Sequence, residues 1–159
     1  MSAADIERAW AVLDTVLDPE VPVLSLRDLG IVRDVREGAA GLEVVLTPTY
    51  SGCPATEVIA ASVREAIDAA GLGPVTVKQQ LAPAWTTDWI SAEGRRKLHD
   101  YGIAPPGAVN TIRIHARGIA CPRCGSLQTE RLSAFGATAC KALYRCLACR
   151  EPFEHFKPI

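Results

Sequence analysis

Apolar residues recur at helical spacing in two stretches of the N-terminal half, and each stretch predicts an amphipathic helix. The first helix is expected over about 4–17 and ends before Pro19, because a residue that precedes proline avoids helical backbone angles. The second is expected from Pro54, a favoured first helical residue, to the capping Gly71. The apolar faces comprise Ile6, Trp10, Leu13 and Leu17 in the first helix and Ala55, Val58, Ile59, Ser62, Val63, Ala66, Ile67 and Ala70 in the second.

Shorter apolar runs bounded by turn residues predict strands over 31–36, 42–47 and 75–81. Residues 37–41 join the first two strands as a hairpin loop. A third helix is expected over about 90–101, ending at Gly102. The order α-β-β-α-β-α predicts an α+β domain over residues 1–104, in which a small mixed sheet carries helices on one face.

Cysteine positions change the picture for the rest of the chain, because five of the six cysteines fall in its last 40 residues. Cys121 and Cys124 form one C-x-x-C knuckle, and Cys146 and Cys149 form a second one after 21 intervening residues. Two such knuckles supply the tetrahedral four-sulfur site that zinc prefers. Residues 105–159 are therefore expected to form a small β zinc ribbon, with much of its stability supplied by the metal.

Two other interpretations of the four cysteines are weaker. A single C-x-x-C can be a redox pair, and an iron site of rubredoxin type uses the same ligands. All four positions are filled by protein, so the metal is expected to be structural and not catalytic. The sequence lacks a Ser-His-Asp triad, a Walker loop and a G-x-G-x-x-G run, so we do not expect an enzyme on its own.

Charge is distributed unevenly, although the net charge is only −1. Residues 1–108 carry 9 Lys/Arg and 15 Asp/Glu, whereas 109–159 carry 8 and 3. The basic tail with its aromatic residues would suit nucleic acid, but it lacks a dense Lys/Arg cluster, so aromatic packing in a small core is the favoured interpretation. With no apolar run near the roughly 18 residues that span a bilayer and no visible signal peptide, a soluble, cytoplasmic protein is expected.

Two cysteines lie outside the knuckles. The loop that contains Ser51 and Gly52 brings Cys53 to the start of the second helix, where the helix dipole and an anion nest favour a reactive thiolate. The alternative is a buried cysteine that serves as a small apolar group. Cys140 is a spare thiol, a core residue or an additional metal ligand, and its position alone does not choose among these.

Three acidic residues, Asp18, Glu20 and Asp28, flank the extended segment after the first helix. If the two helices pack side by side, Asp18 and Glu20 would stand near Cys53, and a thiolate with carboxylates would suit a transient iron site. The alternative is that Asp18 caps the turn at Pro19 and that Glu20 is solvated.

Several motifs together resemble the MIP18-type (DUF59) domain, which is linked to iron–sulfur cluster assembly. They are Asp18-Pro19-Glu20-Val21-Pro22, Leu26-Arg27-Asp28-Leu29-Gly30-Ile31 and Thr47-Pro48-Thr49-Tyr50-Ser51-Gly52-Cys53-Pro54, within residues 4–81. The resemblance implies that Cys53, Asp18, Glu20 and Asp28 are candidates for a transient iron or cluster site.

Further motifs narrow the resemblance to the PaaD (PaaJ) family, the small D subunits encoded with the bacterial phenylacetyl-CoA epoxidase. They are Pro83-Ala84-Trp85-Thr86-Thr87-Asp88-Trp89-Ile90, Cys121-Pro122-Arg123-Cys124, Phe135-Gly136-Ala137-Thr138-Ala139-Cys140-Lys141 and Glu151-Pro152-Phe153-Glu154-His155-Phe156-Lys157. The family is expected to have serine at the position of Ala137. The resemblance covers essentially the whole chain and implies that the four knuckle cysteines are a structural zinc set.

The family resemblance also implies an accessory role in phenylacetate degradation. The chain is expected to be a maturation factor that assists iron or iron–sulfur cluster delivery to the oxygenase or reductase subunits, together with cluster-assembly machinery. The alternative is a non-catalytic component of the oxygenase complex, and a nucleic-acid-binding ribbon is a third, weaker hypothesis. A homodimer is compatible with the sequence, and no membrane association is expected.

Overall fold

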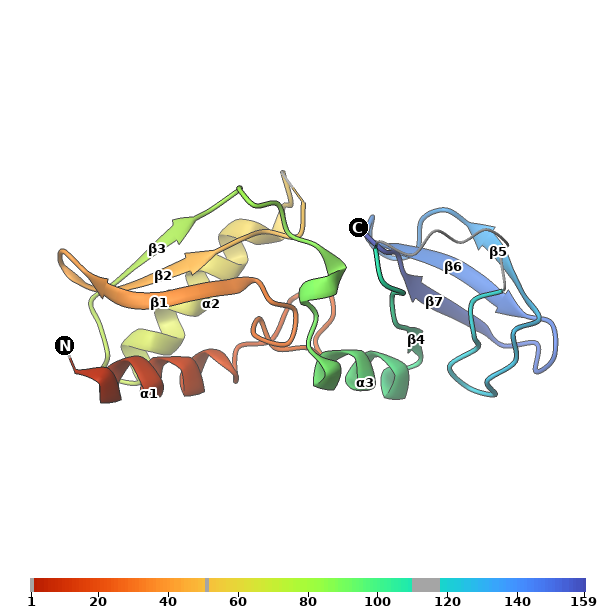
Figure 1. The fold of residues 1–159 in the computed structure, drawn as a ribbon, viewed down its shortest axis with the longest axis horizontal. Coiled ribbons are helices and arrows are strands. Elements are labelled where there is room, and N and C mark those ends of the chain that lie inside the picture. Colours follow the sequence, from red (N-terminus) through yellow and green to blue (C-terminus); the bar gives the residue numbers. More distant parts are fainter. Residues whose placement is uncertain (1, 51, 110–117) are drawn as a thin grey trace. The chain divides into compact units, whose positions relative to one another are not determined.

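The computed structural model describes residues 2–50, 52–109 and 118–159, so that Ser51 of the expected anion nest lies outside the described residues. The chain divides into two units (Figure 1). The first comprises Met1–Trp85 with Trp89–Ser91, and the second comprises Thr86–Asp88 with Ala92–Ile159.

The first unit is built on a three-stranded sheet (Figure 1). β1 (Val32–Gly38) pairs antiparallel with β2 (Gly41–Leu46), and β3 (Val75–Gln79) pairs parallel with the other edge of β2. Parallel strands need a long crossover, which α2 (Ala55–Ala69) supplies, and α2 also packs against α1 (Ala3–Leu13). The predicted α+β class, the hairpin and the mixed sheet are confirmed.

The core of this unit lies where the sheet meets the helices and the segment that follows α1. Its largest fully buried side chains are Leu13, Leu24, Leu26, Leu29, Ile31, Leu42, Val44, Leu46, Val63 and Ile67. Leu42, Val44 and Leu46 alternate along β2 and therefore share one face of the sheet.

α1 is shorter than the helix predicted over 4–17, and the prediction of its last turn was wrong. The amide and the hydroxyl of Thr15 both bond to the carbonyl oxygen of Val12, at 3.0 and 2.7 Å, which tightens the end of the helix. The chain then turns, and Leu17 forms a β-bridge with Ser25. The Leu17 side chain is 51% exposed and does not belong to the apolar face.

α2 begins directly after Pro54 and ends before Gly71, whose φ of +70° gives it the capping role that was predicted. Its buried residues are Ala55, Ile59, Ala60, Val63 and Ile67. Val58 was predicted on this face but is exposed, because the buried stripe advances in steps of four residues and is narrower than the pattern suggested.

Two tryptophans that follow β3 contact residues of the first unit. The indole N–H of Trp85 donates to the carbonyl oxygen of Leu29 at 2.8 Å, and the Arg33 guanidinium lies 3.6 Å from the centroid of the Trp89 ring. Gly30 has a φ of +70°, and a Cβ there would lie 2.7 Å from the carbonyl oxygen of Trp89. The close approach of Trp89 therefore requires glycine at this position.

The second unit contains a four-stranded sheet. In spatial order its strands are β4 (Ile103–Ala104), β7 (Pro152–Phe156), β6 (Lys141–Cys146) and β5 (Thr129–Ser133). The pairs β5–β6 and β6–β7 are antiparallel, and β4 runs parallel to β7. A short 3-10 turn, η1 (Thr87–Trp89), precedes α3 (Ala92–Tyr101), which ends at Gly102 as predicted but begins two residues after the expected start.

The position of α3 bears on the domain boundary. β4 follows α3 directly and pairs with β7, so α3 belongs to the same compact unit as the ribbon. A domain boundary between residues 104 and 105 stays a prediction.

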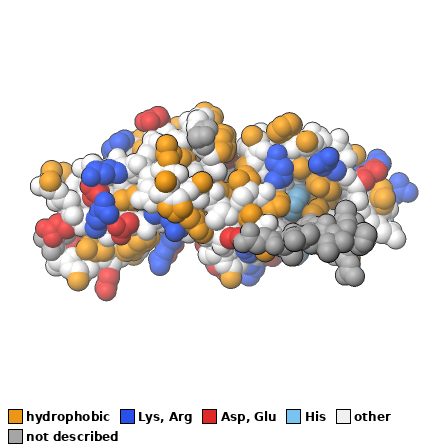
Figure 2. All heavy atoms as spheres, turned by 45° about the horizontal axis from the view of Figure 1, so that its top comes forward, with side chains coloured by type: hydrophobic (Ala, Val, Ile, Leu, Met, Phe, Trp, Pro, Cys, Tyr) orange, Lys and Arg blue, Asp and Glu red, His pale blue; other side chains and the backbone are white. Residues whose placement is uncertain are grey.

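Charged side chains cross the sheet of the first unit on the face opposite Val44. Glu43 of β2 is buried and binds Arg36 of β1 and Lys78 of β3, each at 2.6 Å. The hydrogen bonds from Lys78 and Arg36 hold the pKa of Glu43 below its ordinary value. Figure 2 shows charged side chains interspersed with apolar ones on the face that it draws. In the described part of the chain, no helix is long and apolar enough to cross a membrane.

We expect Glu43→Gln to destabilise the first unit at neutral pH. Because folding lowers the pKa of Glu43, its carboxylate stabilises the fold above the ordinary pKa of 4.5, and this stabilisation is lost as the pH falls through the folded value. Urea unfolding of wild type and variant should differ most near neutral pH and converge in acid. Glu65→Gln, on the exposed side of α2, is the control, and an equal pH response in both variants would contradict this role.

Candidate metal centre and the Cys53 loop

Four thiols converge in the second unit, from the two knuckles that the sequence predicted. The sulfurs of Cys121 and Cys149 lie 3.8 Å apart, and those of Cys124 and Cys146 lie 3.6 Å apart. All four sulfurs lie within 4.8 Å of one another. These separations exceed the about 2.05 Å of a disulfide bond, and all six cysteines of the chain are free thiols.

The sulfur separations fit a tetrahedral zinc site. A zinc–sulfur distance of about 2.3 Å places the corners of a regular tetrahedron about 3.8 Å apart. Two of the separations, 3.6 and 3.8 Å, match that edge. Zinc would therefore be held by thiolates alone, with each position around the ion taken by protein, and would act as a structural cross-link.

The two knuckles share one backbone pattern. The amide of Cys121 donates to Ser126 at 2.9 Å, and the amide of Cys146 donates to Glu151 at 3.0 Å, so each first cysteine bonds five residues ahead. The residue after each second cysteine has a left-handed backbone, with a φ of +75° at Gly125 and +68° at Arg150. The predicted turn role of Gly125 is confirmed, and Arg150 takes the same conformation despite its Cβ.

The surroundings of the four thiols favour the negatively charged form of one of them, Cys146. Backbone hydrogen bonds, first that of the Cys149 amide and then that of Ala148, lower the pKa of Cys146 to about 6. The amide of Glu151 lowers the pKa of Cys149, but burial and the neighbouring thiols outweigh it and raise this pKa to about 12. Several thiolates at this separation therefore need a cation between them.

The metal centre is also part of the ribbon core. The buried cluster of this unit consists of Ala104, Cys121, Cys146 and Phe153, with Ile119 and Tyr144 packed against it. Phe153 and Tyr144 stack with their ring centroids 5.8 Å apart. The aromatic packing expected for the ribbon is confirmed for these two rings.

Cys53 lies directly before α2, as predicted. The carbonyl oxygen of Cys53 accepts the amide of Thr56 at 3.1 Å, in the first turn of the helix. The Cys53 side chain is only 8% exposed. At the start of the same loop, Thr47 buries its hydroxyl without a hydrogen-bond partner among the described residues, a feature that no sequence signal indicated.

Two of the acidic candidates, Asp18 and Asp28, already bond to nearby backbone. The buried Asp18 carboxylate accepts the amides of Glu20 at 2.9 Å and Val21 at 2.7 Å, which confirms its capping of the turn at Pro19. In the residues that the structure describes, the knuckle cysteines are the one group of at least three His, Cys, Asp or Glu side chains that converge. Asp18, Glu20 and Asp28 do not form such a group with Cys53, and an iron site there stays a prediction.

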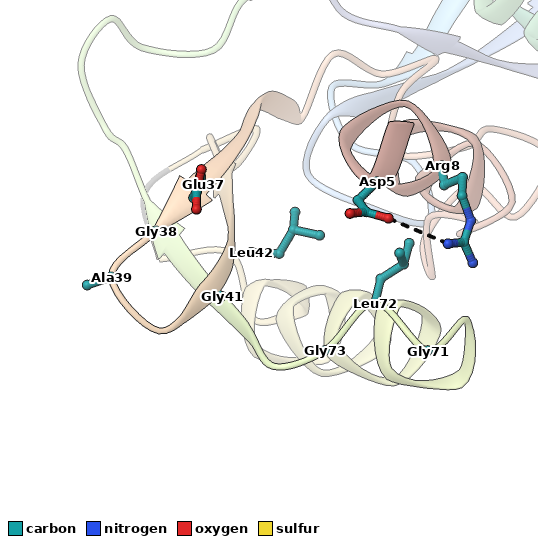
Figure 3. Close-up of a pocket in the computed structure, with 10 residues that line it drawn as sticks. All are labelled: Asp5, Arg8, Glu37, Gly38, Ala39, Gly41, Leu42, Gly71, Leu72 and Gly73. Atoms are coloured by element: carbon teal, nitrogen blue, oxygen red, sulfur yellow. Dashed lines mark ion pairs between the residues drawn. The ribbon is translucent and has the colours of Figure 1, made fainter. Parts of the chain in front are cut away.

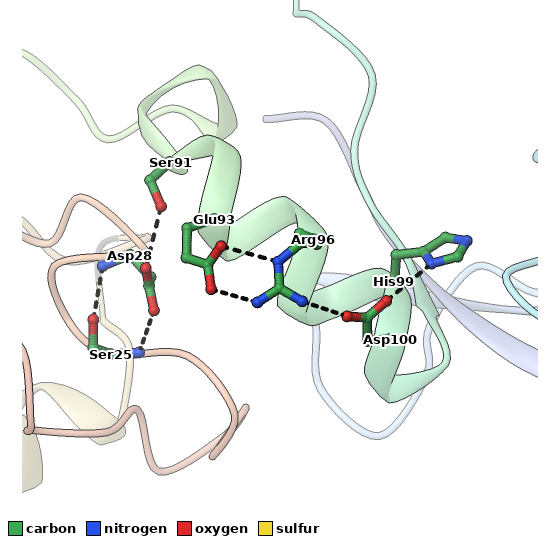
Figure 4. A network of polar contacts seen from close by, with 7 residues as sticks. All are labelled: Ser25, Asp28, Ser91, Glu93, Arg96, His99 and Asp100. Atoms are coloured by element: carbon green, nitrogen blue, oxygen red, sulfur yellow. Dashed lines mark hydrogen bonds and ion pairs between the residues drawn. The ribbon is translucent and has the colours of Figure 1, made fainter.

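Asp28 closes a reciprocal turn. Ser25 donates its amide to the Asp28 carboxylate at 3.1 Å, and the Asp28 amide donates to the Ser25 hydroxyl at 3.0 Å (Figure 4). The hydroxyl of Ser91 donates to the other carboxylate oxygen at 3.2 Å. The three-residue spacing of Ser25 and Asp28 is a recognisable signal in the sequence, whereas nothing in the sequence indicated Ser91.

On α3, Arg96 binds Glu93 at 2.6 Å and Asp100 at 2.7 Å, and His99 lies 3.5 Å from Asp100 (Figure 4). All four side chains are at least half exposed, so solvent screens these contacts and they add little to the stability of the helix. These α3 residues belong to neither the metal centre nor the Cys53 loop.

Cys140 is buried in the second unit, and its sulfur lies 3.0 Å from the Thr138 hydroxyl. It is not one of the converging sulfurs. Of the three interpretations left open for Cys140, its position in this structure favours a core residue.

A cleft of about 390 Å³ in the first unit lies apart from these candidates (Figure 3). The N-terminal part of α1, the β1–β2 hairpin and the loop after α2 line it. Its one arginine, Arg8, pairs with Asp5 at 3.6 Å and donates to the carbonyl oxygen of Ala70. No candidate site residue lines this cleft, so it does not belong to the sites described above.

Comparison with known proteins agrees with this two-part organisation. A family model described as an iron-sulfur cluster assembly protein matches residues 6–78, and one described as the PaaD zinc beta ribbon domain matches 105–157. A relative from Escherichia coli, named as the putative D subunit of 1,2-phenylacetyl-CoA epoxidase, is 49% identical over 154 residues, which cover 97% of this chain and 93% of that protein. This chain belongs to the PaaD family.

A further relative and a solved structure each match more than half of this PaaD-family chain. A protein of Porphyromonas gingivalis named "Fe-S protein maturation auxiliary factor" is 36% identical over 88 residues, covering 54% of this chain and 83% of that one. The crystal structure of a DUF59 domain from Bacillus anthracis is 24% identical with a TM-score of 0.55, and covers 60% of this chain and 92% of that one. The predicted DUF59-type fold is confirmed.

We expect Cys146→Ser to abolish zinc binding, because a buried ligand of the tetrahedral set is lost. Metal analysis should give about one zinc per chain in wild type and in Cys53→Ser, and none in Cys146→Ser. Zinc should also leave wild type as the pH falls, because protons compete with the metal for the thiolates. Full zinc retention by Cys146→Ser would contradict this ligand set.

Backbone strain predicts unequal effects at the two knuckle turns. Gly125→Ala should destabilise the zinc-bound ribbon by about 1 kcal/mol, because the left-handed conformation is strained for alanine and no atom lies within 4 Å to add a clash. Arg150→Gly should change stability by less, since relief of strain offsets the greater freedom of the unfolded chain. Chemical unfolding of both zinc-loaded variants measures the difference, and equal destabilisation would contradict it.

Proposed function

We propose that this chain is an accessory maturation factor of a phenylacetyl-CoA epoxidase in phenylacetate degradation. It would assist delivery of iron or an iron–sulfur cluster to the oxygenase or reductase subunits. The observation that carries the proposal is the joining of two parts in one chain, an iron–sulfur assembly match over residues 6–78 and a PaaD ribbon match over 105–157.

The ribbon supports the proposal because its own metal site is poorly suited to carrying cargo. Four converging thiols leave no open position on a tetrahedral ion, so metal bound by Cys121, Cys124, Cys146 and Cys149 would exchange poorly. This metal is therefore zinc in a structural role, and cargo would be handled by the first unit.

In the first unit, Cys53 is the candidate cargo ligand. Its place before α2 puts the thiol near amide groups and the positive end of the helix dipole. Glu20 would supply a further oxygen ligand, and Asp18 and Asp28 would do so only after their carboxylates were freed from the local bonds described above, so the site would form transiently and Cys53 would become more exposed as cargo binds.

The partners follow from the named relatives. The Escherichia coli relative is called a subunit of the epoxidase, and the Porphyromonas gingivalis relative is called a maturation auxiliary factor. We infer that the chain binds the oxygenase or reductase subunits and receives cargo from cluster-assembly proteins in the cytoplasm. It would not be an enzyme by itself, and a homodimer stays a prediction.

A second candidate function is a non-catalytic component of the oxygenase complex. The burial of Cys53 and the local hydrogen bonds of Asp18 favour it, because both residues then serve the fold. The two functions differ in whether the chain stays bound to the mature oxygenase in a fixed ratio.

Metal counting on anaerobically purified protein tests the proposal. Wild type is expected to contain one zinc and a smaller amount of iron and sulfide, while Cys53→Ser should keep the zinc and lose the iron. Cys140→Ser is the matched control, because it removes the other buried thiol outside the knuckles and should leave the iron unchanged.

One zinc without iron in all three proteins, even after incubation with ferrous iron and sulfide, would contradict cargo handling by this chain. Co-purification with the mature oxygenase at a fixed ratio would then support the component hypothesis.

A further inference from the structure

The loop between β5 and β6 presents an exposed phenylalanine to solvent. Phe135 is 63% exposed, more than any other large apolar side chain in the described part of the chain. Exposure of a benzyl group to water has no benefit for folding. The contacts around the loop therefore decide whether Phe135 is a mobile surface residue or an ordered one.

The carboxylate of Glu154, in β7, binds the loop between β5 and β6. One oxygen of Glu154 accepts the Ala137 amide at 2.6 Å, and the other binds the Lys141 ammonium at 2.8 Å. A Cβ on Gly136 would lie 2.5 Å from the first oxygen, so the loop backbone packs directly against this carboxylate. The Lys141 side chain is buried and its partner Glu154 is half-buried, so the charge of Lys141 is neutralised within the fold.

Other contacts hold the two ends of the loop. The Gly136 amide donates to the Lys141 carbonyl at 2.7 Å, and the Phe135 amide donates to the Ser133 hydroxyl at 3.1 Å. The Lys157 ammonium donates to the Ala134 carbonyl at 3.0 Å and lies 4.6 Å from the centroid of the Phe135 ring. The aromatic ring is thus ordered before any partner arrives.

An ordered exposed aromatic beside a cation has the properties of an interface anchor. Aromatic residues are enriched among the few residues that dominate binding energy, and prior ordering lowers the entropy cost of association. The buried Lys141–Glu154 pair is weak evidence for added stability, so its conformational effect on the loop is the more informative one.

The charges around Phe135 indicate which class of partner would bind there. Residues 133–141 contain no acidic residue, and among the described residues Lys157 has no carboxylate within ion-pair distance. The surface formed by Phe135 and Lys157 therefore complements an apolar pocket with carboxylates at its rim. One unneutralised lysine falls short of the several phosphate contacts that nucleic-acid binding needs.

We propose that Phe135 and Lys157 form a docking surface for an acidic protein surface with an apolar pocket, carried by another subunit of the epoxidase system. The identity of the partner rests on the proposed function.

Calorimetry with the zinc-loaded full chain and the purified oxygenase and reductase components tests the proposal. One component should bind wild type, and Phe135→Ala should weaken that affinity by about tenfold or more. Lys157→Gln should weaken it less and reduce its dependence on salt. Leu127→Ala is the matched control, since Leu127 is 51% exposed in the same unit, and should stay within about twofold of wild type.

Equal affinity of Phe135→Ala and Leu127→Ala would overturn the proposal, provided that zinc content and thermal unfolding are unchanged. Failure of both components to bind wild type would also overturn it, as would single-stranded oligonucleotide binding that is lost in Phe135→Ala.

If Phe135-dependent binding occurs but Cys53→Ser leaves the iron unchanged, the maturation function fails and the docking surface stands. If iron depends on Cys53 while Phe135→Ala binds normally, only the docking surface fails.

Discussion

The convergence of four sulfurs on one point is the constraint on which the second unit depends. Two of the sulfurs, from Cys121 and Cys146, belong to the same small buried cluster as Ala104 and Phe153. A divalent cation removes the repulsion among the thiolates and joins the two knuckles across the sheet. Because two ligand cysteines lie in this small core, loss of the metal would also disturb the packing of the second unit.

The first unit has no comparable cross-link among its described residues, and its buried polar groups bond locally instead. Asp18 caps a turn, Asp28 closes the turn begun by Ser25, and Glu43 joins three strands through Arg36 and Lys78. These carboxylates show why a set of acidic motif residues does not by itself make a metal site. Asp18 and Asp28, which are the motif residues, hold the backbone of the free chain, so any role in cargo binding would require breaking bonds that the fold already uses.

Local signals in the sequence predicted much of this structure, and long-range contacts account for what they missed. Cysteine spacing, the glycine at position 125 and the proline before α2 each act through the nearest few residues, so their consequences could be derived. Leu17 was misplaced because the helix ends at Leu13, before the apolar pattern does, and Val58 was misplaced because periodicity does not reveal which part of a helix face is covered. The bond from Ser91 to Asp28 and the pair of Lys141 and Glu154 join segments far apart in sequence, where no spacing rule applies.

The physical contrast between the units suggests a division of labour. A closed four-thiolate site is thermodynamically suited to hold its ion and poorly suited to give it up, because no coordination position is free for an incoming ligand. A single thiol at a helix start, as proposed for Cys53, would bind cargo weakly and could release it. Cargo transfer also requires that donor and acceptor meet in a fixed orientation, and a metal-stabilised ribbon with an ordered aromatic loop provides a rigid surface for that contact. Under the proposed function, stability and recognition would belong to the second unit, and exchange would belong to the first.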